Sequence, residues 1–424
     1  MRSPASRFLV LALIVVILLS AAGCAPLFVR PPAEIGLLFP LTGEASFVAD
    51  ARNGAVMAVE EINEGAGGIR IGDGTVKLAM LIEDTASAPE TAEAAAKTLL
   101  EKQQVVALLG PTSRSILAVV PLAREAGVVE ISPFAGTTAL DKRGGCIADE
   151  CVFRTVSSDV VMGSGMAWYA QEALGAQKVA FFFSDDAGAR SIQGVLGDAA
   201  QVLGLDAAGE VFFEPGKDSY ADDLAPILAA APDVIFFESS PEDAAVFLQD
   251  AQAAGFGGQW VGTDFVNPSF LEATQQFSEG VYGVNPGVVL DDRYAAWAHE
   301  YEQVIGSSDV SQFAANSYDA VNLVALALEK AGQVSRDAVR QNLRDVATPP
   351  GVQCSSFADC AALLRAGQEI DYDGISGPQD FNDFGDPVSP LKVDQVQSGE
   401  LVRLQTILQT DIGGLIEQVL ELRD

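Results

Sequence analysis

A regular alternation of short apolar runs with longer helical stretches constrains the fold of this sequence more than any other feature. Glu34–Phe39 is the first apolar run, and Asp50–Asn63 then carries apolar residues at helical spacing. Strands that alternate with helices predict a parallel sheet covered on both faces, and strands buried on both faces are apolar throughout. The same pattern predicts strands over Val76–Ile82, Val105–Gly110 and Val128–Ser132, and helices over Pro89–Glu101 and Ser115–Ala126.

The layout then repeats without close sequence identity, which predicts two similar α/β lobes in tandem. Strands are predicted over Lys178–Phe183, Ala207–Phe213, Asp233–Phe237 and Gln259–Thr263, with helices over Ser191–Leu203, Tyr220–Ala230, Pro241–Ala254 and near Asn267–Phe277. The remainder predicts an amphipathic helix over Tyr294–Tyr301, a long helix through Ala320–Leu328, strands near Leu391–Val396 and Leu401–Leu408, and a helix over Asp411–Leu422.

The start of the chain has the order of a secretory signal. Arg2 and Arg7 precede an apolar run, Phe8–Leu19, and small residues follow it. The run is short for a membrane span, which needs about twenty residues, although an uncleaved anchor helix is the alternative. Ala21-Ala22-Gly23-Cys24 resembles the lipobox of bacterial lipoproteins, in which the cysteine becomes the lipidated first residue. We therefore expect residues 1–23 to be a signal peptide and the protein to be lipid-anchored outside the cytoplasm; a chance cysteine after an ordinary signal is the other interpretation.

Composition excludes several classes of function. Lys and Arg number 25 against 58 Asp and Glu, so phosphate backbones would be repelled and we expect no nucleic-acid partner. Hydrophobic residues make up 49% of the chain, which is too apolar for a disordered protein. His299 is the single histidine, so catalysis or metal binding by several imidazoles is excluded. An acidic surface is expected to keep an exported protein soluble.

Four cysteines beyond Cys24 fall into two local pairs. Export permits disulfides, and we expect Cys146–Cys151 and Cys354–Cys360, each closing a small loop. Four cysteines allow three pairings, and the sequence alone does not choose among them. A zinc site is the rival, but the pairs lack the spacing of a zinc knuckle and no histidine lies near them.

Six motifs carry a resemblance to a known family. They are Ile35–Gly43, Gly54–Asn63 with Gly67-Gly68-Ile69, Leu109–Ser113, Ile131–Thr137, Ser317–Val321 and Phe381–Asp386. In this order they resemble the type I periplasmic solute-binding proteins, and most of all the leucine/isoleucine/valine-binding branch, over residues 34 to 405.

The resemblance implies two Rossmann-like lobes joined by a three-segment hinge, with the ligand bound in the cleft and the lobes closing on it. It implies that the protein is a monomer without a cofactor, which delivers an amino acid or related small polar solute to the permease and ATPase subunits of an ABC importer. We expect lobe 1 to span 34–155 and about 286–375, lobe 2 to span 156–285 and about 376–410, and 411–424 to form a C-terminal helix.

The resemblance also suggests ligand contacts in the first lobe. Ser113 would meet a ligand carboxylate at the start of a helix; its alternative role is to cap that helix. In the family, the backbone and a threonine of the next loop hold the carboxylate and ammonium groups of the ligand. That loop contains Ala135, Gly136 and Thr137, and the position of the family threonine is Gly136, with Thr137 one step later. Phe47 is expected to pack on the apolar part of the ligand or, alternatively, in the core.

In the second lobe, Asp264 is expected to pair with the α-ammonium of the ligand, the alternative being a helix cap. Two family aromatics are absent, because Ala187 and Ser240 stand at their positions. Ser240 is included among the expected ligand contacts. With Glu238, Asp185 and Arg190 close by in sequence, the pocket is predicted to suit a more polar or larger ligand than leucine.

Rival functions come from other classes. An enzyme is one rival, but the chain lacks a nucleophile elbow, an H-E-x-x-H pair and a Walker A loop. Asp185 with Asp186, or Asp264 with Glu238, could be proposed as an acid/base pair, although acidic pairs are common by chance in so acidic a chain. A calcium loop at Asp380–Gly385 would lack two required ligands, so we expect no metal site. A ligand-sensing or regulatory lipoprotein of the same fold, with no transport role, is the serious alternative.

Overall fold

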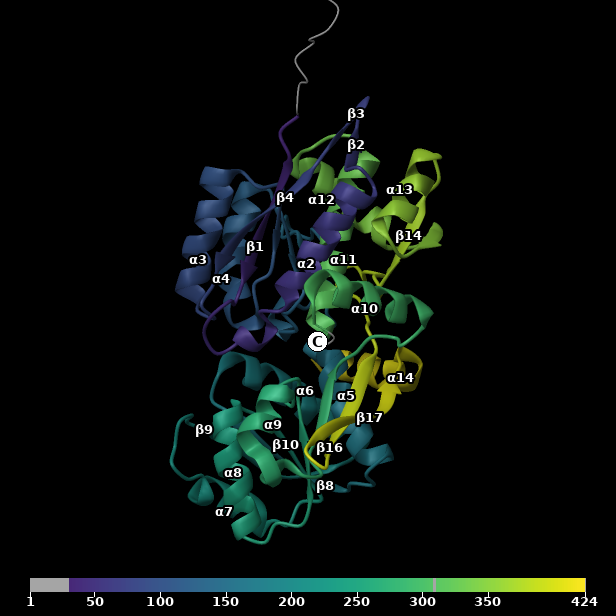
Figure 1. Cartoon of the computed structure of the whole chain (residues 1–424). Coiled ribbons are helices and arrows are strands. Elements are labelled where there is room, and N and C mark those ends of the chain that lie inside the picture. Colours follow the sequence, from purple (N-terminus) through teal and green to yellow (C-terminus); the bar gives the residue numbers. More distant parts are fainter. Residues whose placement is uncertain (1–29, 308–309, 424) are drawn as a thin grey trace, which may run out of the picture. The chain divides into compact units, whose positions relative to one another are not determined.

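The structure is a computed structural model that describes residues 30–307 and 310–423, and the chain from Ala33 onward forms one compact unit (Figure 1). The predicted signal peptide and Cys24 lie outside the described residues. Within the described part, no helix has the length and apolar character needed to cross a membrane.

The first sheet is fully parallel and has the strand order β4-β1-β5-β6-β7. Ile35 and Leu37 of β1 pack in one core with α2 and α11, whereas Leu38 packs on the opposite face with α3 and α4 (Figure 1). The strands are β1 (Ala33–Phe39), β4 (Leu78–Asp84), β5 (Ala107–Leu109), β6 (Val129–Ser132) and β7 (Val152–Arg154). The helices are α2 (Ala51–Glu60), α3 (Pro89–Lys97), α4 (Ser113–Ala126) and α11 (Gln312–Ala331), with the short turns η1 (Ser46–Val48), η2 (Glu61–Gly65), η3 (Thr98–Gln103) and η4 (Thr138–Leu140).

The second sheet has the order β17-β16-β12-β11-β10-β8-β9, in which β16 and β17 run antiparallel to their neighbours. Helices α5, α6 and α14 cover one face, and α7, α8 and α9 cover the other. The strands are β8 (Lys178–Ser184), β9 (Asp206–Phe213), β10 (Val234–Glu238), β11 (Gln259–Gly262), β12 (Tyr282–Pro286), β16 (Leu391–Gln397) and β17 (Glu400–Ile407). The helices are α5 (Asp159–Glu172), α6 (Ala187–Leu203), α7 (Ala221–Ala229), α8 (Pro241–Ala253), α9 (Pro268–Thr274) with η5 (Gln275–Ser278), and α14 (Gln409–Leu422).

Smaller elements complete the core around the first sheet. The long helix α11 is buried from Gln312 to Glu329, and it lies so close to α2 that a Cβ atom at Gly54 would overlap the carbonyl oxygen of Ala314. The chain passes from one core to the other three times, after β7, after β12 and after β15, in agreement with the three crossings predicted. The remaining elements are β2 (Ile69–Ile71), β3 (Gly74–Val76), α10 (Asp292–Ile305), α12 (Arg336–Ala347), β13 (Val352–Cys354), α13 (Phe357–Arg365), β14 (Ile370–Gly374) and β15 (Gly377–Pro378).

The prediction of an α/β fold with two parallel sheets is confirmed, and both predicted disulfides are present, Cys146–Cys151 and Cys354–Cys360. The single strand predicted over Val76–Ile82 is wrong, because β3 ends at Val76 and turns back on β2, while β4 begins at Leu78. The C-terminal helix α14 does not stand apart, since it packs on α5 and α6.

Candidate functional site

The predicted site residues gather at the carboxyl ends of both parallel sheets. Ligands of open α/β sheets bind at this end of the strands. The loops after β1, β5 and β6 belong to the first sheet, and the loops after β8, β10 and β11 belong to the second.

Asp84, the last residue of β4, organises the loop after β1. Its carboxylate accepts hydrogen bonds from the backbone N–H groups of Leu41 (3.0 Å), Thr42 (3.2 Å) and Ala86 (2.8 Å), and from the Thr42 hydroxyl (2.6 Å). Burial tends to raise the pKa of Asp84, but these donors outweigh it and hold the pKa below its usual value. This carboxylate therefore has its partners within the protein.

The loop of Ala135, Gly136 and Thr137 is also held by internal hydrogen bonds. The Ala135 N–H donates to Ser132 Oγ (2.9 Å), the Gly136 N–H to the Phe134 carbonyl (3.1 Å) and the Thr137 N–H to Ser113 Oγ (3.2 Å). The N–H groups predicted to hold a ligand carboxylate thus shape their own loop. Thr137 is buried, and its hydroxyl accepts from Ala139 N at the start of η4.

Ser113 is the first residue of α4 and not its cap. The preceding Thr112 has the extended backbone of the N-cap position, although its side chain makes no capping hydrogen bond. Ser113 Oγ accepts from Thr137 N, which leaves its hydroxyl proton free to be donated to a third group. The first N–H groups of a helix have no acceptor within it, and the positive end of the helix dipole favours an anion there.

Arg154, at the end of β7, lies fully buried beneath this loop. Its guanidinium donates to the carbonyl oxygens of Gly136 (3.0 Å) and Thr137 (3.0 Å), to Asp141 (2.7 Å) and to Asp386 (2.6 Å). The two carboxylates and two carbonyl groups stabilise the buried positive charge of Arg154. Through the two carbonyl groups, Arg154 in turn fixes the 135–137 loop.

Asp159, which was not among the predicted site residues, occupies the space that a side chain at position 136 would need. A Cβ atom at Gly136 would overlap Asp159 Oδ1, and the Asp159 N–H donates to the Gly136 carbonyl (2.7 Å). Ser191 of α6 donates to Asp159 Oδ2 (2.8 Å). Burial raises the pKa of Asp159 to about 7. The only signal in the sequence is its place directly after Ser158, at the start of a helix that shows no amphipathic pattern.

Glu238 ends β10, and Asp264 lies two residues beyond the end of the neighbouring strand β11, directly after Thr263. Glu238 is only 8% exposed, and burial raises the pKa of its carboxyl well above the usual value, with further contributions from Asp264, Asp186 and Asp159. Asp264 is half-buried; burial raises its pKa to about 6, against which Lys392 acts. Helix α9 is capped by Asn267, whose side chain accepts from Phe270 N, so Asp264 is not the cap of that helix.

The remaining predicted ligand contacts are Ser240 and Phe47. Ser240 caps α8, because its hydroxyl accepts from Asp243 N (3.1 Å) and donates to Asp243 Oδ2 (2.8 Å). Phe47 lies in η1 and Ala187 begins α6, and the side chains of both lie outside what the structure describes. The ligand roles of Ser240 and Phe47 stay predictions.

Several contacts join the loops of the two sheets. Arg114 on α4 lies 3.7 Å from Asp186 at the start of α6 and also pairs with Glu44. The Thr138 N–H donates to Ser191 Oγ (3.1 Å). Arg423 pairs with Asp198 on α6 (2.6 Å) and approaches the Thr138 hydroxyl (3.4 Å). The two sets of strand ends therefore face one another.

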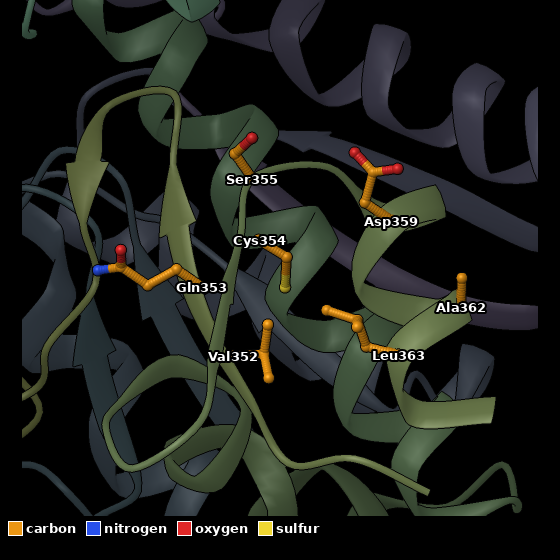
Figure 2. A pocket seen from close by; sticks show the side chains of 7 residues that line it. All are labelled: Val352, Gln353, Cys354, Ser355, Asp359, Ala362 and Leu363. Carbon is orange, nitrogen blue, oxygen red and sulfur yellow. The ribbon is translucent and has the colours of Figure 1, made fainter. Parts of the chain in front are cut away.

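A separate depression of about 530 Å³ lies between β13, an edge strand of the three-stranded sheet β13-β14-β15, and α13 (Figure 2). Val352 of β13 and Leu363 of α13 line it beside the Cys354–Cys360 disulfide, with Asp359 at the rim. None of the predicted ligand residues belongs to its lining, so it is not part of the candidate site.

A sequence model of the family described as "periplasmic binding protein" matches residues 32–400. This chain belongs to the periplasmic binding protein family. The resemblance inferred from the motifs is thus confirmed, and so is the prediction that the protein is not an enzyme, since the family and its relatives bind substrates. The family implies a location outside the cytoplasm. His299, which might have served a catalytic site, is exposed on α10.

Two curated relatives and one solved structure illustrate this membership. A chemotactic signal transduction system substrate-binding protein, BasB of Halobacterium salinarum, is 24% identical, with 86% of this chain and 87% of BasB covered. A leucine-, isoleucine-, valine-, threonine- and alanine-binding protein of Pseudomonas aeruginosa is 23% identical, with 73% and 82% covered. The structure of the Thermotoga maritima leucine-binding protein LivK matches with a TM-score of 0.75 at 21% identity, covering 89% of this chain and 99% of LivK. This periplasmic binding protein therefore has the type I fold predicted.

Proposed function

We propose that this protein holds an amino acid or a related small polar solute between the two sets of strand ends and delivers it to an ABC importer. The observation that carries this proposal is that the carboxyl ends of the two parallel sheets face each other, joined by Thr138–Ser191 and Arg114–Asp186. A ligand that contacts both sets of loops would bind the closed form more tightly than the open form. Binding would therefore shift the hinged protein towards its closed form.

The chemistry at the two edges differs in a way that suits a zwitterion. The start of α4, with the Ser113 hydroxyl, favours the carboxylate of an amino acid. Asp264, and with it Glu238, favours the ammonium group. Ala135, Gly136 and Thr137 would then contribute mainly the shape of the pocket wall, because their N–H groups are engaged.

We further propose the lobe boundaries given by the sequence, with lobe 1 over 34–155 and about 286–375 and lobe 2 over 156–285 and about 376–410. The two hydrophobic cores support this division. The sequence set residues 411–424 apart as a C-terminal helix, and the packing of α14 on α5 and α6 supports our counting α14 with lobe 2. The closed form would be what the permease recognises, and we expect a monomer to be sufficient.

A thermal-shift screen tests the binding function. Purified protein would be heated with amino acids, amides, small peptides, aromatic acids and sugars, because a ligand of the folded state raises the melting temperature. Stabilisation by an amino acid that is lost in Asp264→Ala would support the proposed site. If every amino acid leaves the melting temperature unchanged at millimolar concentration, amino-acid binding is rejected.

A ligand-sensing lipoprotein is the second candidate function. The observation that favours it is the likeness to BasB, a substrate-binding protein of a chemotactic signal transduction system, over 86% of this chain. Deletion of the gene separates the two functions. Loss of uptake of the labelled ligand would support transport, whereas intact uptake with a lost behavioural response would support sensing.

We also propose that Cys24 carries the lipid anchor. The small residues before it and the compartment of the family support this. Cys24→Ala removes the residue that would carry the lipid. The variant should therefore leave the membrane fraction, because its lipid anchor is lost. Continued pelleting of the variant with membranes would instead indicate an uncleaved anchor helix at residues 8–19.

A further inference from the structure

Three carboxyl groups meet at the second-sheet side of the candidate site. Asp159 begins α5, Glu238 ends β10 and Asp264 follows β11; we call these three residues the carboxyl cluster. Besides burial, which is the largest cause, Asp264 contributes to the raised pKa of both Asp159 and Glu238, and Asp159 contributes to that of Glu238. The three charges are therefore close enough to repel one another.

The cations near this cluster already have acidic partners. Arg154 is held by Asp141 and Asp386, and Arg114 by Glu44 and Asp186. Lys392, which acts on Asp264, lies 3.4 Å from Asp394. Arg154 and Lys392 lower the pKa of Asp159 and Asp264, but each is shared with other acids, and the groups that shift the pKa of Glu238 include no cation.

A buried hydroxyl in the same place makes no well-formed hydrogen bond within the described residues. Thr263 is fully buried, and its Oγ1 makes no hydrogen bond of good geometry to any group in the part of the chain that the structure describes. The hydroxyl nevertheless lies near enough to Glu238 and Asp264 to lower the pKa of both, against the larger effect of burial. A buried hydroxyl without a partner costs free energy, which indicates that a further polar group belongs here.

One ammonium group does not offset a cluster of three carboxyls. Asp264 is sufficient for the α-ammonium of any amino acid, which leaves Glu238 and Asp159. Buried carboxylates are stable only when they are paired with positive charge or protonated.

We propose that the ligand is a basic amino acid, whose α-ammonium group binds Asp264 and whose second cationic group binds Glu238, with Asp159 and the Thr263 hydroxyl alongside. This inference rests on the proposed function, because it assigns the charge of the ligand at the same site. The rival is that Glu238 takes up a proton instead of a cation, in which case a neutral amino acid would bind equally well.

Matched ligand pairs test the inference by titration calorimetry of the purified protein at pH 8. The pairs are lysine with norleucine, ornithine with norvaline, and arginine with citrulline, in which only the second cationic group differs. We expect at least one basic member to bind about tenfold or more tightly than its neutral partner, as expected of a charge-assisted hydrogen bond. Equal affinity within every pair would overturn the inference.

Substitution of Glu238 tests whether this residue causes the preference for the basic ligand. In Glu238→Gln the ratio of the affinities for the basic and the neutral member of a pair should fall below about threefold, because the basic member loses more affinity than the neutral one. Glu242→Gln is the matched control, since Glu242 is an exposed carboxylate in the first turn of α8 and the net charge changes equally. A preference that persists in Glu238→Gln would overturn the assignment. If that variant fails to fold, Glu238→Asp, which shortens the side chain but keeps its charge, should retain the preference with weaker affinity.

The same experiment separates this inference from the proposed function. Binding of leucine or norleucine without any basic preference would reject the basic ligand and leave the amino-acid-binding function intact. Failure of all six amino acids and leucine to bind would reject the proposed function itself.

Discussion

Asp84 ends the edge strand β4 of the first sheet, whereas Asp264 follows the inner strand β11 of the second sheet, and the surroundings of the two carboxyls differ. Asp84 accepts four hydrogen bonds from the loop beside it, which hold its pKa low. Burial raises the pKa of Asp264 to about 6, and hydrogen bonds from its own backbone and Thr263 and the charge of Lys392 oppose this. The first-sheet loops after β1 and β6 are thus held by their own hydrogen bonds, whereas burial dominates the pKa of Glu238 and Asp264 and Asp159 accepts a single side-chain hydrogen bond, from Ser191. On the proposed function, the loops of the first sheet form a rigid wall and hold the carboxylate of the ligand, and the carboxyls of the second sheet select for positive charge.

Removal of Arg154 should break the first-sheet wall and has the largest expected effect. Arg154→Met would leave Asp141 and Asp386 without their buried partner and free the carbonyls of the 135–137 loop. We expect a loss of about 3–5 kcal/mol in the free energy of unfolding, measured by chemical denaturation. Arg340→Met is the control, because its pair with Asp149 is exposed and should change stability by at most about 0.5 kcal/mol. Equal small effects would show that Arg154 does not fix the loop.

Removal of Asp264 should affect binding and not folding. Asp264→Ala is expected to weaken an amino-acid ligand by about 1.5–3 kcal/mol, because it removes one charge-assisted hydrogen bond. The measurement is titration calorimetry, accompanied by a melting curve without ligand to show that the fold is intact. Unchanged affinity would exclude Asp264 from the ligand site.

The same carboxyl makes binding dependent on pH. An ammonium group binds the ionised form of Asp264, and the raised pKa of about 6 means that this form is lost as pH falls through that value. Affinity at pH 5 should therefore be about tenfold weaker than at pH 7. Glu238, Asp159 and Lys392 face Asp264 and also contribute, so that Asp264→Asn should reduce the slope without abolishing it. A flat profile between these pH values would contradict the prediction.

Substitution of Ser240 has the smallest expected effect. It tests whether Ser240 contacts the ligand or only caps α8. Ser240→Ala should cost about 1 kcal/mol of stability, since the N-cap of α8 is lost. Ser335→Ala removes the cap of α12, far from the site, and should cost the same. A change of ligand affinity in the first variant alone would show that Ser240 contacts the ligand in addition to capping α8.

Much of the fold could be predicted from the sequence, because most strands are continuous apolar runs and most helices are amphipathic. Helix α5 was not predicted from the sequence, for a physical reason. From Asp159 to Ala167 it is buried on all sides, so its apolar residues follow no helical period. The β2–β3 hairpin escaped because Val76 and Leu78, in different sheets, read as one strand.

The candidate site was predicted less completely, because its geometry depends on contacts between distant segments. Ser113 and Asp264 were placed at strand ends by local pattern alone. The N–H groups of Ala135 and Thr137 donate to the hydroxyls of Ser132 and Ser113, and the motif alone does not reveal these hydrogen bonds. Asp159 could not be found at all from the motif that it completes, since it lies more than twenty residues beyond Gly136 in the sequence.

The overlap between positions 136 and 159 also has an evolutionary consequence. Because Asp159 fills the space that a side chain at Gly136 would need, the two positions cannot be exchanged independently. A change from Gly136 to threonine would be harmful while Asp159 is present and tolerated once a smaller residue stands there. Any path between this binding site and one with threonine at 136 must therefore pass through position 159 first, so that ligand preference would change in an ordered pair of steps.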